Sequence, residues 1–159
     1  MPGIGSFAVG LLSSFNAVAD DCAVGEAGYR AAMETGDGKI RGWAEYHWAV
    51  LLDNIDDDPA GALPRYDKAL EFATKSGDGY FEYYVIRHLA PHKEPAERIA
   101  MLRRSLHLRA ALGARPQTLA AQALLADHLP EDDPERAELM QTFRPGVEEL
   151  HIGWLLSDI

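Results

Sequence analysis

The sequence predicts an all-α protein. Alanine occurs 24 times and leucine 19 times, whereas valine, isoleucine and threonine together occur 17 times, so residues that favour helices outnumber those that favour strands. Several segments place apolar residues three and four positions apart, as on one helical face, and no segment sustains a polar/apolar alternation. A length of 159 residues, 47% of them hydrophobic, fits one globular domain, and we expect a single domain over residues 1–159.

Charge and cysteine usage narrow the classes of partner and compartment. Lysine and arginine total 15 against 25 aspartate and glutamate residues, and the resulting net charge of −10 repels nucleic-acid phosphate and anionic lipid. We therefore expect neither nucleic acid nor a membrane as a partner. Cys22 is the only cysteine, which excludes an intrachain disulfide and a cysteine zinc site and indicates a cytoplasmic protein. We expect no metal and no cofactor.

The apolar stretch of residues 4–18 has two interpretations, an export signal or a packed first helix. No lysine or arginine occurs before Arg30, and Ser13, Ser14 and Asn16 interrupt the stretch, which is unlike an export signal. The stretch is also too short and too polar to span a membrane. We expect a packed helix there.

Proline and glycine mark the ends of two long helices. The segments Pro59–Gly77 and Pro95–Gly113 each begin with proline, which is favoured in the first helical turn, and end with glycine, which closes a helix in a left-handed conformation. Aligned without a gap, the two segments carry apolar residues in the same phase. The matched pairs are Leu63 with Ile99, Tyr66 with Leu102, Leu70 with Leu106, and Phe72 with Leu108.

Further helices follow from the same signals. The motif METGDG at 33–38 echoes TKSGDG at 74–79, which predicts a helix at about 19–35. Others are expected at 39–54, 80–90 and 117–128, and from Asp133 until Pro145 interrupts the helix. Asp37, Asp58 and Asp78 are expected N-caps. Gly36, Gly77 and Gly113 lie 41 and 36 residues apart, a period typical of antiparallel helix pairs stacked into a solenoid.

A family resemblance supports this architecture. The segment ALPRYDKALEFA, residues 62–73, resembles the second helix of a tetratricopeptide repeat, with Ala62, Tyr66, Ala69 and Leu70 at the positions of the pattern. Residues 98–108 fit less closely, with Ser105 at the second small position. The resemblance implies a right-handed solenoid of about four helix pairs that binds other molecules in a concave groove.

The C-terminal residues 145–159 place Val147, Leu150 and Trp154 on one helical face. The last repeat of a solenoid needs a cap over its stacking face, and we expect a capping helix here. A contact between copies of the chain is the alternative.

Catalytic motifs are lacking. The sequence contains no Walker loop, HExxH, GxSxG or CxxC motif. The glycine pattern of residues 3–8 formally matches a dinucleotide-binding motif but has no strand before it. His47, His88 and His128 fall on successive first helices of the expected pairs, where they would either converge on a ligand or metal or serve as separate packing and surface residues. We lean against an enzyme.

Aromatic residues crowd two expected first helices: Trp43, Tyr46, Trp48, Tyr80, Phe81, Tyr83 and Tyr84. Their rings either pack between helices or reach the groove, where rigid rings with polar tips suit ligand binding. Glu45 and Glu82 precede tyrosine at matching positions and would be repeated acids of the groove. The predicted groove set is Trp43, Tyr46, His47, Tyr83, Tyr84, Arg87 and His88.

Charge is unevenly distributed along the chain. Residues 87–115 hold seven basic residues against two acidic ones, and residues 131–149 hold seven acidic residues against two basic ones. Opposite charges on adjacent helices indicate neutralisation within the chain or between subunits, and solvated helix faces are the simpler interpretation. A basic patch for docking an acidic partner is the remaining option, with four residues: Arg98, Arg103, Arg104 and Arg109.

The leading functional hypothesis is an adaptor that binds a protein or peptide in the groove. The alternative is a small-molecule-binding protein or enzyme with a closed pocket in the same groove and Glu45, His47, Tyr83 or His88 as acid or base. A third hypothesis is an assembly subunit that associates with copies of itself through the basic segment and the C-terminal helix.

Overall fold

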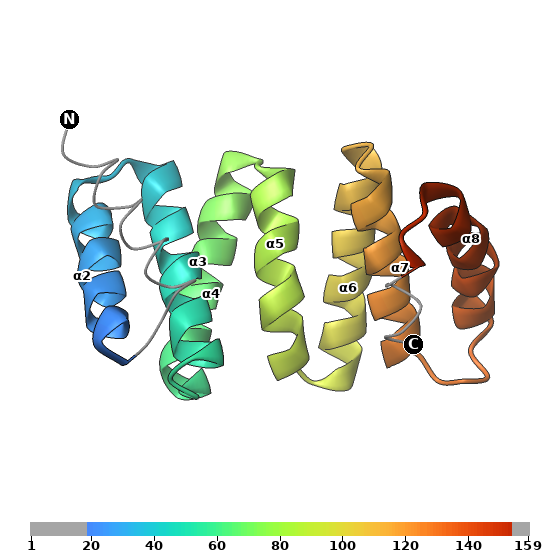
Figure 1. The fold of residues 1–159 in the computed structure, drawn as a ribbon, viewed down its shortest axis with the longest axis horizontal. Coiled ribbons are helices and arrows are strands. Elements are labelled where there is room, and N and C mark those ends of the chain that lie inside the picture. The colour runs from blue at the N-terminus through green and yellow to red at the C-terminus, as the bar shows by residue number, and fades with distance from the viewer. Residues whose placement is uncertain (1–18, 154–159) are drawn as a thin grey trace. The chain divides into compact units, whose positions relative to one another are not determined.

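The described part of the chain is built from helices (Figure 1). The computed structural model describes residues 19–153, with side-chain environments from residue 25 onward. Its elements are α2 (Ala19–Thr35), α3 (Gly38–Asn54), α4 (Pro59–Ser76), α5 (Gly79–Leu89), a 3₁₀ turn η1 (Ala90–His92), α6 (Pro95–Ala111), α7 (Arg115–His128) and α8 (Pro134–Leu150). No strand occurs within residues 19–153, which confirms the all-α prediction for this part. The expected helix in residues 4–18, the glycine pattern at 3–8 and Trp154 lie outside the described residues.

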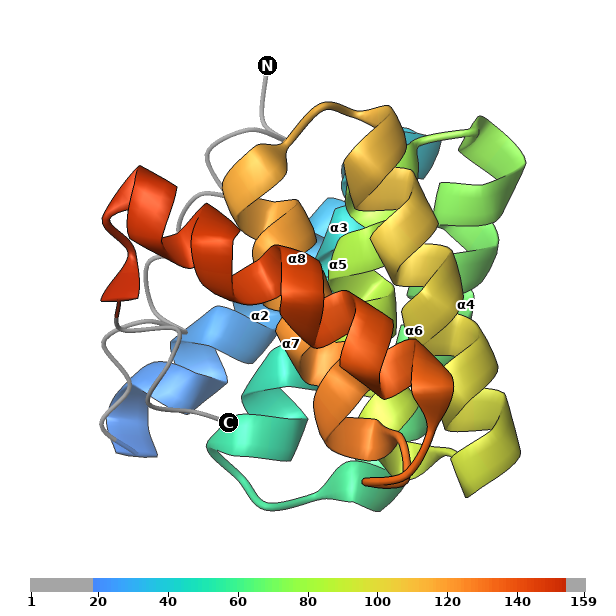
Figure 2. The same ribbon diagram turned by 90° about the vertical axis from the view of Figure 1, so that its right-hand side faces the viewer.

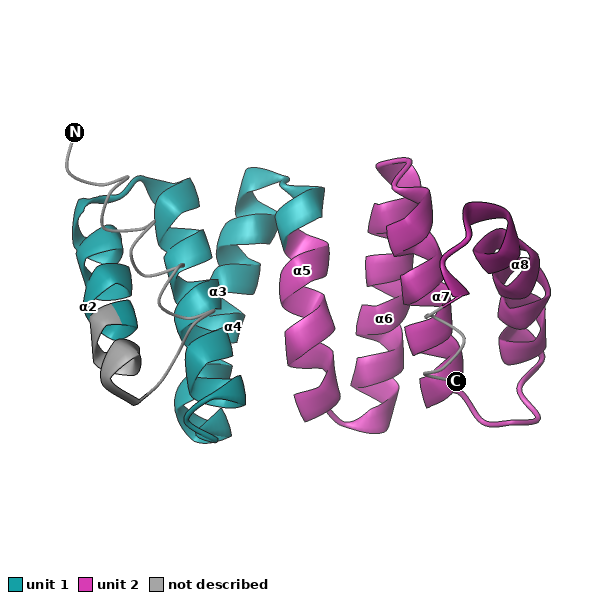
Figure 3. Cartoon of the chain, viewed as in Figure 1, with its two compact units in different colours: residues 1–81 teal, residues 82–159 magenta. Residues whose placement is uncertain are grey.

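The chain divides into two compact units, residues 1–81 and 82–159 (Figure 3). In the first unit, α3 contacts both α2 and α4. In the second unit, α7 contacts both α6 and α8, and α6 also contacts η1 (Figure 2). Helix α5 crosses the boundary between Phe81 and Glu82. Of the helices in residues 19–153, none combines the length and the apolar character needed to cross a membrane.

Aspartate side chains begin four of the helices. Asp37, Asp58 and Asp78 each accept a hydrogen bond of 3.0 Å from the backbone N–H three residues later. Asp133 accepts one of 2.8 Å from the N–H of Glu135. Each bond satisfies one of the N–H groups that a helix start leaves without a partner. The three predicted N-caps are therefore confirmed.

Glycines end α4 and α6 as predicted. Gly77 has φ of 66° and Gly113 has φ of 68°, both in the left-handed region where a side chain would be strained. The N–H of Gly77 donates to the carbonyls of Ala73 and Thr74, so the last turn of α4 keeps its hydrogen bonds.

The prediction that Pro145 interrupts the last helix is wrong. Helix α8 continues through Pro145 to Leu150. Phe143 and Val147, on either side of this proline, are fully buried and pack with Leu119 of α7. Pro145 itself lies on the exposed side, where water can replace the donor that proline lacks. Tertiary packing thus outweighs one missing backbone hydrogen bond. Residues 145–150, where the sequence predicted the start of a separate capping helix, are the last part of α8.

Small residues allow α3 and α4 to approach closely. Ala62, Ala69 and Ala73 are fully buried on one face of α4, beside the fully buried Tyr66. On α3, a Cβ atom added to Gly42 would lie 2.9 Å from both Phe72 Cβ and Phe81 Cε1, closer than side-chain carbons pack. The ring of Tyr66 fills the remaining space, and its hydroxyl donates to Asp53 Oδ2 at 3.2 Å.

We expect Gly42→Ala to destabilise the protein although alanine is the better helix former. The alanine gains about 1 kcal/mol in helix propensity, but its methyl group overpacks the contact with Phe72, which costs about 1–3 kcal/mol. Denaturant unfolding followed by circular dichroism should show a lower free energy of unfolding. Gly38→Ala is the control, because its Cβ would lie 4.0 Å from Phe72 Cε1. Equal stability of both variants would contradict the close approach.

We expect Tyr66→Phe to change how stability depends on pH. Burial and the charge of Asp53 raise the pKa of Tyr66 above the ordinary value of 10.0. The folded state therefore keeps this hydroxyl protonated, and wild type loses stability as pH rises past 10.0, where the unfolded chain releases the proton. At neutral pH the variant lacks one hydrogen bond to a charged group, about 1.5–3 kcal/mol.

The difference in free energy of unfolding between wild type and Tyr66→Phe should accordingly narrow at alkaline pH. Tyr80→Phe, at an exposed position, should follow wild type throughout. A constant difference for Tyr66→Phe across this range would show that the buried hydroxyl is not the titrating group.

Candidate functional site

The predicted groove residues fall in both compact units. Trp43, Tyr46 and His47 lie on α3 in the first unit, and Tyr83, Tyr84, Arg87 and His88 lie on the part of α5 that belongs to the second unit. Each set is therefore described within its own unit.

In the first unit, partly exposed rings line one face of α3. Trp43 stacks on Phe81 with ring centres 4.2 Å apart and on His47 at 5.7 Å. Tyr80, at the start of α5, lies 6.3 Å from Trp43 and is 49% exposed. Trp43 and His47 are half-buried and four residues apart, so they share a helical face. We call Trp43, His47 and Tyr80 the ring row.

The other aromatic residues of this unit form its core. Tyr46 is buried, with its ring edge-on to Trp43 at 5.7 Å and to His47 at 4.9 Å. Trp48 is also buried, and the guanidinium carbon of Arg65 lies 3.2 Å from its ring centre, a close cation–π contact. Most of the aromatic excess in the sequence therefore serves helix packing, and the ring row is the part of it that reaches the surface of this unit.

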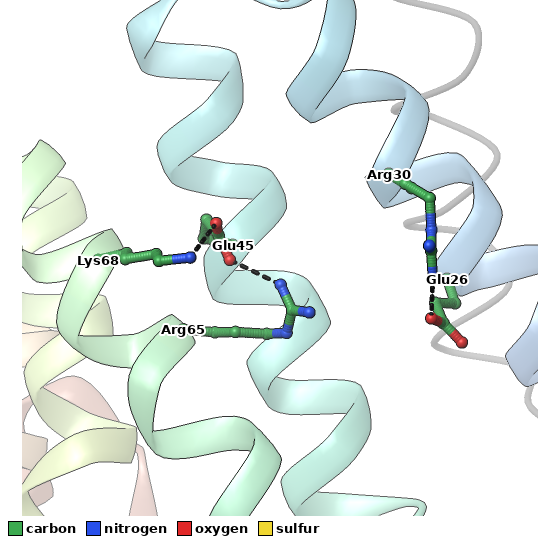
Figure 4. A network of polar contacts seen from close by, with 5 residues as sticks. All are labelled: Glu26, Arg30, Glu45, Arg65 and Lys68. Carbon is green, nitrogen blue, oxygen red and sulfur yellow. Dashed lines mark hydrogen bonds and ion pairs between the residues drawn. The ribbon is translucent and has the colours of Figure 1, made fainter.

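The two expected groove acids are nearly buried and hold cations from the following helix. Glu45 accepts a hydrogen bond of 2.9 Å from Arg65 Nη1, and Lys68 Nζ lies 3.5 Å from its other oxygen (Figure 4). Glu82 accepts from Arg104 at 2.8 and 3.2 Å. Lys68 and Arg104 occupy the same position in the aligned segments 59–77 and 95–113. Because loss of the cation would leave a nearly buried carboxylate without its partner, these contacts fix neighbouring helices.

A pocket of about 440 Å³ opens in the first unit on the opposite side of α3 from the ring row. Its lining residues come from α2, α3 and α4: Met33, Arg41, Glu45, Lys68, Glu71, Phe72 and Lys75. At 100° of rotation per residue, Arg41 and Glu45 point away from Trp43 and His47. Glu45 is the one predicted acid or base that lines this pocket. The sequence did not predict the other residues that line the pocket, because they lie on three helices and form no motif on any one of them.

In the second unit, the groove set meets the predicted basic patch. Tyr83 is buried and stacks on the half-buried Tyr84 with ring centres 4.9 Å apart. The guanidinium carbon of Arg109 lies 4.5 Å from the ring centre of Tyr83. Arg87 is exposed and His88 half-buried in the last turn of α5. The contact between Arg109 and Tyr83 joins α6 to α5, so no local sequence pattern indicates it.

The four arginines of the predicted patch each have a partner inside the second unit. Arg98 donates to the carbonyls of Ala90, Pro91 and Lys93 and so ties η1 to α6. The carboxylates of Glu135 and Glu82 hold Arg103 and Arg104 by hydrogen bonds, which raise the pKa of both guanidinium groups. Arg109 is buried.

Basic and acidic segments neutralise each other within the chain, as one interpretation of the charge pattern predicted. Arg103 contacts Glu135 at 2.5 Å, and Arg115 contacts Glu149 at 2.5 Å. The bond from Arg115 lowers the pKa of Glu149. Both pairs link the segment 87–115 to the segment 131–149. Because they are solvent-exposed, each contributes little to stability.

Histidines do not define a metal centre in this part of the chain. His47 packs in the ring row, and Nδ1 of His128 lies 2.8 Å from the carbonyl oxygen of Leu124 on its own helix. Within residues 19–153, no group of three histidine, cysteine, aspartate or glutamate side chains is arranged to hold a metal ion.

Comparison with known proteins finds no matching family model and no matching curated protein. The functional argument therefore rests on the residues and their contacts.

Proposed function

We propose that this chain is a tetratricopeptide-like repeat protein that binds a peptide segment of another protein. The proposal includes a right-handed solenoid of about four antiparallel helix pairs and a cytoplasmic location. Its support begins with the sequence pattern of residues 62–73. In addition, the two members of each apolar pair matched between segments 59–77 and 95–113 are buried to the same degree. Tyr66 and Leu102 are buried, and the members of the other three pairs are all half-buried.

The observation that carries the proposal is a repeated face of partly exposed rings. Glu45 and Tyr46 align with Glu82 and Tyr83, and the same register aligns Trp43 with Tyr80 and His47 with Tyr84. In α3 the buried Tyr46 anchors the helix while Trp43 and His47 reach the surface. In α5 the buried Tyr83 has the same place beside the partly exposed Tyr80 and Tyr84.

Such rings suit the side chains of a bound peptide. Trp43 is held flat by Phe81 on one face, and Tyr80 extends its surface. Rigid rings lose little conformational entropy on binding and bury large areas, which is why tyrosine and tryptophan dominate binding hot spots. His47 adds a polar edge that donates or accepts a hydrogen bond. An apolar or aromatic peptide side chain against the exposed surface of the ring row, chiefly Tyr80, is the expected contact.

The test begins with a random-peptide display library selected on the immobilised protein. A selected peptide is then titrated by calorimetry into wild type, Tyr80→Ser and Ile55→Ser. Tyr80→Ser should weaken binding by about 1–2 kcal/mol, roughly 5- to 30-fold, because it removes exposed contact area from the ring row. Ile55→Ser removes a comparable surface, 47% exposed against 49%, at the end of α3 and should bind as wild type. No enriched peptide, or equal binding by both variants, would contradict the proposal.

A second candidate function, small-molecule binding, is favoured by the pocket of the first unit. Met33 and Phe72 give the pocket an apolar part, and Arg41, Lys68 and Lys75 outnumber its two carboxylates. Lys68 pairs with Glu45 and Lys75 with Glu71, whereas Nε of Arg41 bonds only the carbonyl of Gly36. An apolar molecule with one anionic group fits these side chains.

Octanoate is the probe for this second function. Titration of the ¹⁵N-labelled protein should shift amide signals of α3 and α4 around Arg41 and Phe72, and Arg41→Gln should weaken the effect by about tenfold, since a charged hydrogen bond is lost. Lys39→Gln removes a cation on the same helix that does not line the pocket and should change nothing. Octanol acting as strongly as octanoate would refute an anion site.

A further inference from the structure

The second unit contains a buried arginine that no carboxylate neutralises. Arg109 is 4% exposed. Its guanidinium lies over the ring of Tyr83, and Nη1 donates to the carbonyl of Gln117 at 2.9 Å. Its Nε is buried and has no hydrogen-bond partner. A buried charge is ordinarily paired, because desolvation without a counter-charge costs several kcal/mol.

A second cation, Arg87, lies near Arg109. Burial lowers the pKa of the Arg109 guanidinium, and the nearby charge of Arg87 lowers it further. Within the described residues, neither Arg87 nor Arg109 forms an ion pair with a carboxylate. Arg103, Arg104 and Arg115 of the same unit all do. Arg98 and Arg144 of this unit also lack a carboxylate partner among the described residues, but Arg109 is the arginine that is buried without one.

Helix packing alone does not require an arginine here. The position of Arg109 in the segment 95–113 corresponds to Ala73 in the segment 59–77, and Ala73 is fully buried. A small apolar residue thus fills the equivalent site of the first unit. The larger, charged side chain is specific to the second copy.

Arg109 lies over the ring of Tyr83, and Arg87 and Tyr84 lie nearby. On α5, Arg87 follows Tyr83 by four residues and Tyr84 by three, so it shares a helical face with each of them. Arg109 reaches this face from α6. Arg87 is exposed and Tyr84 half-buried, so both can be reached from solvent, while Arg109 adds its charge from beneath.

We propose that Arg87 and Arg109 form a binding site for a carboxylate, supplied by an acidic side chain or the C-terminus of a bound peptide. The assumption that a peptide supplies this carboxylate rests on the function proposed above. A carboxylate accepts hydrogen bonds on two oxygens and pairs with guanidinium through its planar fork. Arg87 supplies the exposed fork, and the bound anion neutralises the charge of Arg109, which has a carbonyl but no carboxylate as its partner.

The test follows the Nε–H signals of Arg87 and Arg109 and the indole N–H signal of Trp43 in the ¹⁵N-labelled full-length protein. The first probe is an alanine-based peptide with one aromatic residue, one glutamate and a free C-terminus. The second has glutamine and an amidated C-terminus in their place, and the third is inorganic phosphate. The acidic peptide should shift both arginine signals saturably, and the neutral peptide should not.

Substitutions separate binding from a purely structural role of Arg109. Arg87→Gln changes an exposed side chain and should weaken the acidic peptide about tenfold or more, because a charge-assisted bond is lost. Arg144→Gln removes an exposed cation from α8 of the same unit and should have no effect. If Arg109 only joined α5 to α7, Arg87→Gln would not alter the affinity, and that result would overturn the proposal.

The three signals also separate this proposal from the proposed function. Arginine shifts without a Trp43 shift would support the carboxylate site and count against peptide binding at the ring row. A Trp43 shift without arginine shifts would leave the proposed function standing and overturn the carboxylate site. Response to phosphate but not to the acidic peptide would also overturn it, since the anion would then be free phosphate.

Discussion

Close packing of consecutive helices is the constraint on which the other features depend. In the first unit, α4 presents alanines to α3, and Gly42 on α3 has no room for even a methyl group beside Phe72 and Phe81. Where two helices approach this closely, each large side chain must either fill the space completely, as Tyr66 does, or leave the contact. The rings that leave it on α3 are Trp43 and His47, so the same constraint that builds the core also determines which rings reach the surface.

Polar groups within these contacts are satisfied in pairs that join one helix to the next. Tyr66 bonds Asp53, Glu45 bonds Arg65, and Glu82 bonds Arg104. Such pairs add little net stability, but removal of one partner is costly, so they favour one arrangement of neighbouring helices over others. Arg109 does not follow this rule. It has two aromatic neighbours and a carbonyl, and no acid, which is the observation behind the proposed carboxylate site.

Helix boundaries were predictable because their causes are local. An aspartate that bonds an N–H three residues later, a proline in the first turn and a left-handed glycine after the last turn all act within one turn of the chain. The prediction for Pro145 was wrong because its outcome depends on contacts of Phe143 and Val147 with α7. These contacts outweigh the missing bond, and their strength depends on a residue more than twenty positions away in the sequence.

The candidate site was predictable only in part, for the same reason. The sequence indicated that aromatic residues cluster at 43–48 and 80–84, but the helical face that neighbours cover decides which rings are buried. Tyr46 and Tyr83, the repeated tyrosines, are core residues. The pocket draws on three helices, and the contact of Arg109 with Tyr83 joins residues 26 positions apart. No local pattern predicts either.

The uneven charge of the chain bears on how an acidic ligand would be selected. A net charge of −10 repels any acidic peptide at long range. This repulsion is screened beyond about 8 Å at physiological ionic strength, whereas the field of a partly desolvated guanidinium acts at contact and is screened far less. Random collisions with anions are therefore disfavoured, and only a carboxylate that reaches the cluster of Arg87 and Arg109 gains their attraction. A cationic cluster on a chain of net negative charge would thus make binding depend on fit rather than on overall charge.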